Sequence, residues 1–223
     1  MRSILVLDGV SLPHATDRPV ISLTPADKAI AHIPGWQMLV DPDYIVGGKA
    51  RNLAIPNSIT EHNGNNFTTS TFANGEKAFD LSEDRRIQPN IAFPTEAWTF
   101  FAVAKPSTNI DAQYYVGAVS SADSPAIEPS LGITAGAGGV RTWSRANTDP
   151  RASVTMSLAG EEVYIMWTGS TRDGCRIYIN GVELDHNAGA TEPFNKNFGP
   201  GEWRCLYGVR GLVGMMGLLS IDL

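Results

Sequence analysis

Cysteine is scarce in this sequence: Cys175 and Cys205 are the only two among 223 residues. No Cys-x-x-Cys pair occurs, and two cysteines do not make a zinc site without histidine or carboxylate ligands. We expect both to be small buried side chains in strands. A disulfide between them is the alternative, and it requires the two strands to be neighbours.

Charge is also sparse. Charged residues make up 18% of the chain, the net charge is −6, and no run of Lys and Arg is longer than Arg85–Arg86. Nucleic acids and anionic membranes attract clustered positive charge, so neither is an expected partner. A lightly charged surface is typical of a protein that packs against neighbours.

Long apolar runs are missing. Ile4–Leu7 is stopped by Asp8, which leaves it shorter than the apolar core of a secretory signal. No run approaches the length that crosses a membrane. We therefore expect a protein that is made in a cytoplasm and is not exported by a visible signal.

Helical signals are nearly absent. The one candidate is residues 24–35, where Thr24 would cap a short helix, Pro25 would open it and Gly35 would follow it. The rest of the chain reads as short strands between turns, two of which are marked by Asn74-Gly75 and Asn180-Gly181. The predicted strands cover residues 4–7, 67–72, 77–81, 98–104, 114–119, 131–134, 140–144, 154–158, 163–168, 176–179, 182–184, 203–209 and 215–223.

About a dozen short strands predict an all-β protein built as an antiparallel sandwich. We expect one domain over residues 1–223, with a sandwich core at 59–223 and a first strand within 1–9 that pairs into it. Residues 10–58 are rich in proline, so we interpret them as an extended N-terminal arm that contains the short helix. In the hairpin 175–187, Cys175, Ile177 and Ile179 alternate with Arg176 and Tyr178, which predicts one buried and one half-exposed face.

Three segments carry a resemblance to a known family. They are 98-WTFFAVAKP-106, 163-VYIMWTGSTRDGCRIYINGVEL-184 and the closing stretch 206–223, which begins LYGVRG and ends GLLSIDL. Their order and spacing over residues 57–223 resemble the concanavalin A-like (laminin G-like) jelly-roll domains, of the kind also found in bacteriophage virion proteins. The resemblance implies an antiparallel jelly-roll β-sandwich.

The catalytic chemistry of that family needs two carboxylates on one strand, because glycoside hydrolysis uses an acid and a base or nucleophile close together. No such pair occurs: Glu161 and Glu162 are adjacent, and Asp80 lies in a polar turn. We therefore predict a non-enzyme with no catalytic residues and no cofactor. Calcium is the one alternative cofactor; Asp41 with Asp43, or Asp173 with Asp185, are its candidate ligands, although no Asp-rich series predicts a metal site.

Aromatic side chains provide the remaining candidates. Trp98 and Trp167 lie in the strongest core strands, so we place them in the core. The aromatics outside those strands are candidates for a glycan site or a protein interface: Trp36, Tyr44, Trp143 and Trp203.

The resemblance leads to two functional hypotheses. The first is a structural protein of a bacteriophage particle, most of all a capsid decoration or cement protein that forms a homo-oligomer and contacts other virion proteins. Its location would be the virion, after synthesis in the host cytoplasm. The alternative is a carbohydrate-binding, lectin-like module of a tail fibre or other adhesion protein, whose partner would be a glycan of the host surface. Fold alone does not decide between them.

Overall fold

The structure is a computed structural model that describes residues 33–55, 58–62, 66–82, 86–107, 113–118, 130–134, 139–143, 150–189 and 198–221. The chain divides into two units, residues 1–34 and Gly35–Leu223, and every strand found among the described residues lies in the second. The predicted strand at 4–7 and the predicted helix up to residue 32 lie outside the described residues. No helix among the described residues is long and apolar enough to cross a membrane.

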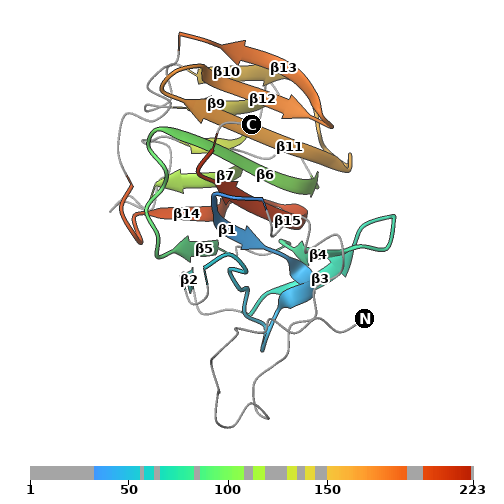
Figure 1. Cartoon of the computed structure of the whole chain (residues 1–223). Helices are drawn as coiled ribbons and strands as arrows, with labels where there is room; N and C mark the ends of the chain where they lie inside the picture. Colours follow the sequence, from blue (N-terminus) through green and yellow to red (C-terminus); the bar gives the residue numbers. More distant parts are fainter. Residues whose placement is uncertain are drawn as a thin grey trace. The chain divides into compact units, whose positions relative to one another are not determined.

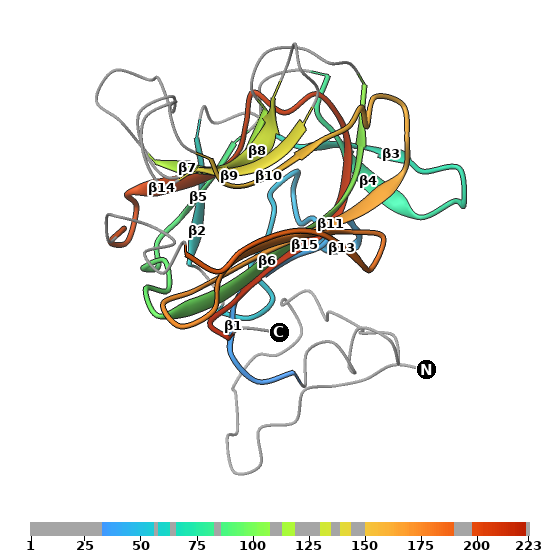
Figure 2. The same cartoon turned by 90° about the horizontal axis from the view of Figure 1, so that it is seen from above.

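The second unit is an all-β sandwich of two antiparallel sheets (Figures 1 and 2). The eight-stranded sheet has the order β13-β12-β11-β6-β15-β4-β3, with β1 also paired to β15. Its strands are β1 (Trp36–Val40), β3 (Thr68–Thr71), β4 (Lys77–Asp80), β6 (Ala97–Pro106), β11 (Val163–Ser170), β12 (Gly174–Ile179), β13 (Val182–Asn187) and β15 (Gly211–Leu219). The predicted antiparallel jelly-roll sandwich is confirmed at the level of fold class.

The seven-stranded sheet has the order β10-β9-β8-β7-β14-β5-β2. Its strands are β2 (Ile59–His62), β5 (Arg86–Pro89), β7 (Gln113–Ala118), β8 (Ser130–Thr134), β9 (Gly139–Trp143), β10 (Pro150–Thr155) and β14 (Trp203–Tyr207). A single turn of 3-10 helix, η2 (Pro42–Tyr44), follows β1. Two of these strands, β2 and β5, are absent from the sequence prediction because they are short and polar.

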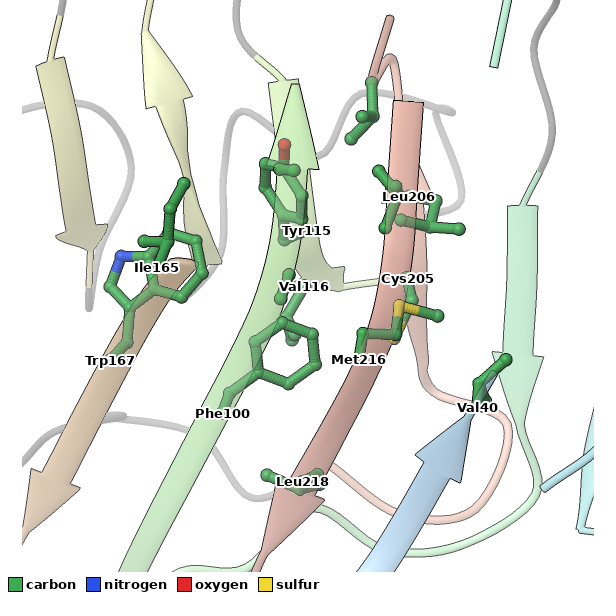
Figure 3. Packing of buried hydrophobic residues seen from close by; sticks show 14 of the residues in the cluster. Val40, Phe100, Tyr115, Val116, Ile165, Trp167, Cys205, Leu206, Met216 and Leu218 are labelled. Carbon is green, nitrogen blue, oxygen red and sulfur yellow. The ribbon is translucent and has the colours of Figure 1, made fainter. Parts of the chain in front are cut away.

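The core lies between the two sheets, as alternation along the strands requires. In β6 the side chains of Trp98, Phe100, Ala102 and Ala104 belong to the buried cluster. Figure 3 shows Phe100 and Trp167 of the eight-stranded sheet next to Tyr115 and Val116 of β7. The predicted core positions Trp98 and Trp167 are both fully buried.

Two Asn-Gly turns close hairpins at the predicted places. Asn180 and Gly181 have φ values of 52° and 79°, the left-handed conformation that a two-residue hairpin needs. Asn74 and Gly75 join β3 to β4, and the Asn74 side chain accepts a hydrogen bond from the Glu76 amide at 3.0 Å. In β12 the buried and half-exposed residues alternate as predicted for the hairpin 175–187.

The arm predicted at residues 10–58 is wrong in its C-terminal half. β1 lies inside that range and pairs with β15 from Trp36↔Leu219 to Val40↔Met216. The sandwich therefore begins at Gly35 and not at residue 59. The prolines of this region misled the prediction. Pro34 precedes β1 and Pro42 is the first residue of η2, so neither interrupts the strand.

Both cysteines are buried side chains in strands, as expected. Cys175 lies on β12 of the eight-stranded sheet and Cys205 on β14 of the seven-stranded sheet, and the two form no disulfide. Burial raises the pKa of the Cys205 thiol far above its ordinary value. A thiol held in the protonated form is a poor nucleophile.

Candidate functional site: the outer face of the eight-stranded sheet

The side of the eight-stranded sheet that points away from the core carries an unusual set of side chains. We call this set the outer face. Six of its residues alternate with core positions on β6, β11 and β12: Phe101, Val103, Tyr164, Met166, Arg176 and Tyr178. The seventh is Trp36, which precedes a register shift in β1 and lies against Phe101. Cross-strand register places Tyr164 beside Val103, and Met166 between Phe101 and Tyr178. These residues therefore lie on one side of the sheet across β1, β15, β6, β11 and β12, with β15 between β1 and β6.

Three aromatic rings follow one another across this surface. The rings of Trp36 and Phe101 are 5.7 Å apart in an edge-to-face arrangement, and the rings of Phe101 and Tyr164 are 5.6 Å apart at a tilt of 31°. Phe101 is 8% exposed and forms the floor, while Trp36 and Tyr164 are half-buried on either side of it. Edge-to-face and tilted contacts of this kind fix the ring orientations.

A glycine makes room for the Trp36 ring. Gly217 of β15 lies directly opposite Phe101 in the sheet. A Cβ atom at Gly217 would overlap the Trp36 ring and press on Phe101. The position of Trp36 over the sheet therefore depends on the missing side chain at this residue.

Polar groups lie at the β13 end of the outer face. The Tyr178 hydroxyl donates to Glu183 Oε2 at 2.9 Å, and Arg176 Nε lies 3.8 Å from the same oxygen. Burial raises the pKa of the Tyr164 hydroxyl, and desolvation is also the largest cause of the raised pKa of Tyr178. Both phenols are therefore neutral hydrogen-bonding groups at physiological pH.

The apolar character of this face needs an explanation. An antiparallel sheet with one solvated face normally shows polar side chains on that face. Here Val103, Met166 and three aromatic rings occupy the positions where polar residues are expected, and all but Phe101 retain solvent exposure. Continuous apolar surface with a polar rim marks an interaction site on a soluble domain.

The structure separates the four aromatics that the sequence singled out. Trp36 belongs to the outer face. Trp203 is fully buried, with its ring 5.2 Å from that of Phe93 and its Nε1 donating to Ile91 O at 2.7 Å, so it supports the core. Tyr44 is half-buried in η2, and Trp143 lies on β9 with its side chain outside the described residues.

Sequence reasoning missed Phe101, Tyr164 and Tyr178 as candidates. Their signal was present: in WTFFAVA and VYIMW the core positions alternate with a second set of apolar residues. We assigned both segments to core strands as a whole, so the side chains that point away from the core were not considered as candidates.

The candidate calcium ligands have structural roles. Asp41 accepts from the Asp43 amide at 2.8 Å at the start of η2, and Asp185 accepts from the Ser153 amide of β10 at 2.7 Å. Asp173 receives the Arg172 guanidinium at 2.8 Å. In the part of the chain that the structure describes, no group of three or more His, Cys, Asp or Glu side chains is arranged to hold a metal ion.

The fold is shared with solved carbohydrate-binding and receptor-binding domains. Domain 4 of AbnA, a GH43 extracellular arabinanase from Geobacillus stearothermophilus solved with arabinotriose, is similar with a TM-score of 0.56 at 14% identity, over 74% of this chain and 83% of that chain. The ligand binding domain of botulinum neurotoxin serotype D, solved with N-acetylneuraminic acid, has a TM-score of 0.59 at 11% identity, over 85% of this chain and 48% of that chain.

A third similar structure comes from botulinum neurotoxin type C, whose cell entry is described as dependent on two ganglioside molecules. It has a TM-score of 0.54 at 11% identity, over 85% of this chain and 48% of that chain. This chain thus spans about half the length of the toxin domains. No family model and no curated protein sequence matches the chain.

Proposed function

We propose that this chain is a carbohydrate-binding module that holds a glycan on the outer face of the eight-stranded sheet. The observation that carries the proposal is the row of Trp36, Phe101 and Tyr164 on the side of the sheet that points away from the core. The apolar faces of sugar rings stack on aromatic rings, and a few fixed polar groups then set their orientation. Tyr178 and Glu183 supply such groups on β12 and β13, at the end of the outer face.

The similar structures support this assignment over a purely structural role. Their descriptions name arabinotriose, N-acetylneuraminic acid and gangliosides as bound or required molecules. These are properties of those proteins, and they raise the expectation that a sandwich of this fold presents a sugar site. They do not locate that site here, which is why the proposal stands on the outer face itself.

The test uses a glycan array followed by calorimetric titration of the best glycan. Gly217→Ala pushes Trp36 away from the sheet, and Tyr164→Ala removes the ring at the other end of the row. Each ring contact is worth about 0.5–1.5 kcal/mol, so each variant should bind roughly two- to tenfold more weakly. Tyr207→Ala is the matched control, because Tyr207 is a half-buried tyrosine on β14 of the other sheet.

The proposal requires that Tyr207→Ala binds like the unmodified chain while both outer-face variants lose affinity and keep their near-UV circular dichroism. A folded chain that binds no glycan on the array would overturn it. Equal losses in all three variants would also overturn it, because they would indicate a general loss of structure.

A second candidate is self-association through the same face, as the structural-protein hypothesis requires. Val103 and Met166 favour it, because they are half-buried apolar side chains without a polar group for a sugar. Met166→Glu would then lower the mass measured by sedimentation, whereas glycan binding alone predicts a monomer in both cases. The structural-protein hypothesis also predicts that the N-terminal arm contacts another chain and is needed for attachment. The deletion that tests this should end at residue 34, because β1 belongs to the sandwich.

A further inference from the structure

The charges on the eight-stranded sheet are balanced. Its strands contain three Lys or Arg residues, and each forms an ion pair with a carboxylate: Lys77 with Asp43 at 3.2 Å, Lys105 with Glu162 at 3.1 Å, and Arg176 with Glu183 at 3.8 Å. An acidic ligand on this sheet would therefore meet cations that already have an anionic partner.

Glu183 adds a negative charge at the β13 end of the outer face. The Glu183 side chain is 43% exposed; its carboxylate accepts a hydrogen bond from the Tyr178 hydroxyl and lies 3.8 Å from Arg176 Nε. The carboxylate of an acidic sugar stacked near Tyr178 would face this negative charge. Arg176 is the arginine of the outer face, and the Glu183 carboxylate beside it offsets the attraction that its guanidinium would exert on an acidic sugar.

We propose that the outer face selects uncharged glycans over sialylated ones, and that Glu183 sets this selectivity. The inference rests on the proposed glycan-binding function and names the ligand class within it. The hydrogen-bonding groups that the face offers, the Tyr178 hydroxyl and the Glu183 carboxylate, suit the hydroxyl groups of a neutral sugar. Rejection of a like charge is the second component of such selectivity.

The seven-stranded sheet has the opposite balance. Its strands contain Arg86, Arg141, Arg151 and Arg204, against the single carboxylate residue Glu61. Arginine is the residue that matches carboxylate and phosphate geometry best.

The experiment titrates matched glycan pairs that differ by one sialic acid, such as lactose and 3′-sialyllactose, with arabinotriose as a further neutral probe. Because the charges are exposed, we expect the sialylated member to bind about two- to fivefold more weakly at low salt. The difference should vanish in 1 M NaCl, where the screening length is about 3 Å. Glu183→Gln removes the negative charge beside Arg176 and should close or reverse the difference. Combining it with Arg176→Gln should remove any reversal.

The outcomes separate the two proposals. Tighter binding of the sialylated member by the unmodified chain, or a ratio that Glu183→Gln leaves unchanged, would overturn the selectivity while glycan binding itself stands. Binding of neither member of any pair, nor of arabinotriose, by a folded chain would overturn the proposed function and this inference with it.

Discussion

The Asn52 side chain is hydrogen-bonded to the backbone of β1. Replacing it with alanine therefore tests whether β1 belongs to the folded domain. Asn52 Oδ1 accepts from the Leu39 and Ala54 amides, both at 3.0 Å. Its Nδ2 donates to Gln37 O at 2.9 Å and to Ser58 Oγ at 2.7 Å. The side chain is 3% exposed, so Asn52→Ala leaves the buried partner groups without a replacement.

We expect Asn52→Ala to lower the free energy of unfolding by about 2–4 kcal/mol. The Leu39 amide and the Gln37 carbonyl become unpaired, and each unpaired buried group costs about 1–3 kcal/mol. Ser58 keeps a bond to Ile55 O and contributes little to the loss. Urea unfolding followed by tryptophan fluorescence measures the difference, which is a large share of the stability of a domain this size.

The control for this substitution is Asn187→Ala. Asn187 is exposed and accepts one hydrogen bond from the Gly189 amide at 3.1 Å, so its loss should change the unfolding free energy by less than about 0.5 kcal/mol. If Asn52→Ala unfolds at the same urea concentration as Asn187→Ala, residues 35–58 do not belong to the sandwich. The extended-arm interpretation of this segment would then be restored.

Three further predictions follow from other parts of the core and surface. Gly169→Ala places a Cβ against the buried Trp98 ring and should lower the unfolding free energy by about 1–3 kcal/mol, measured in urea; no change would contradict the tight packing. The Ala73 amide donates to the Glu162 carboxylate, and this hydrogen bond lowers the pKa of Glu162. The NMR shift of that amide should therefore change with a midpoint below 4.5, because the hydrogen bond is present above the lowered pKa and is lost as the pH falls through it. Tyr115→Phe should raise the unfolding free energy by about 1–3 kcal/mol, because its hydroxyl is buried, has a raised pKa and makes no hydrogen bond to the described residues; a loss would reveal an internal partner.

The strands that the sequence predicted correctly are those with a strong local signal. β6 and β11 are long apolar runs, and the hairpins at Asn74-Gly75 and Asn180-Gly181 have the residues that their turn conformations require. β1 was missed although WQMLV is apolar, because it is short and lies among prolines. What places it is non-local: its pairing with β15, nearly 180 residues away.

The candidate site was less predictable than the fold. Trp36 was among the candidates, but nothing in the local sequence says that its ring rests on Gly217 and Phe101. Trp203 was also a candidate, because it lies outside the strongest core strands. Its packing against Phe93 shows that it belongs to the core. An aromatic residue reveals its role only when the strands on both sides of it are known.

Two glycine substitutions in the same sheet can therefore distinguish an effect on stability from an effect on glycan binding. Gly169 lies on β11 against Trp98, which faces the core, whereas Gly217 lies on β15 against Trp36, which does not. The added methyl group is the same, but the Trp36 ring can move toward solvent and the Trp98 ring cannot. Gly169→Ala should thus lower stability while the folded fraction still binds glycan, and Gly217→Ala should weaken glycan binding at a smaller cost in stability. If both variants lost stability and binding to the same degree, the outer face would be part of the scaffold and not a separate site.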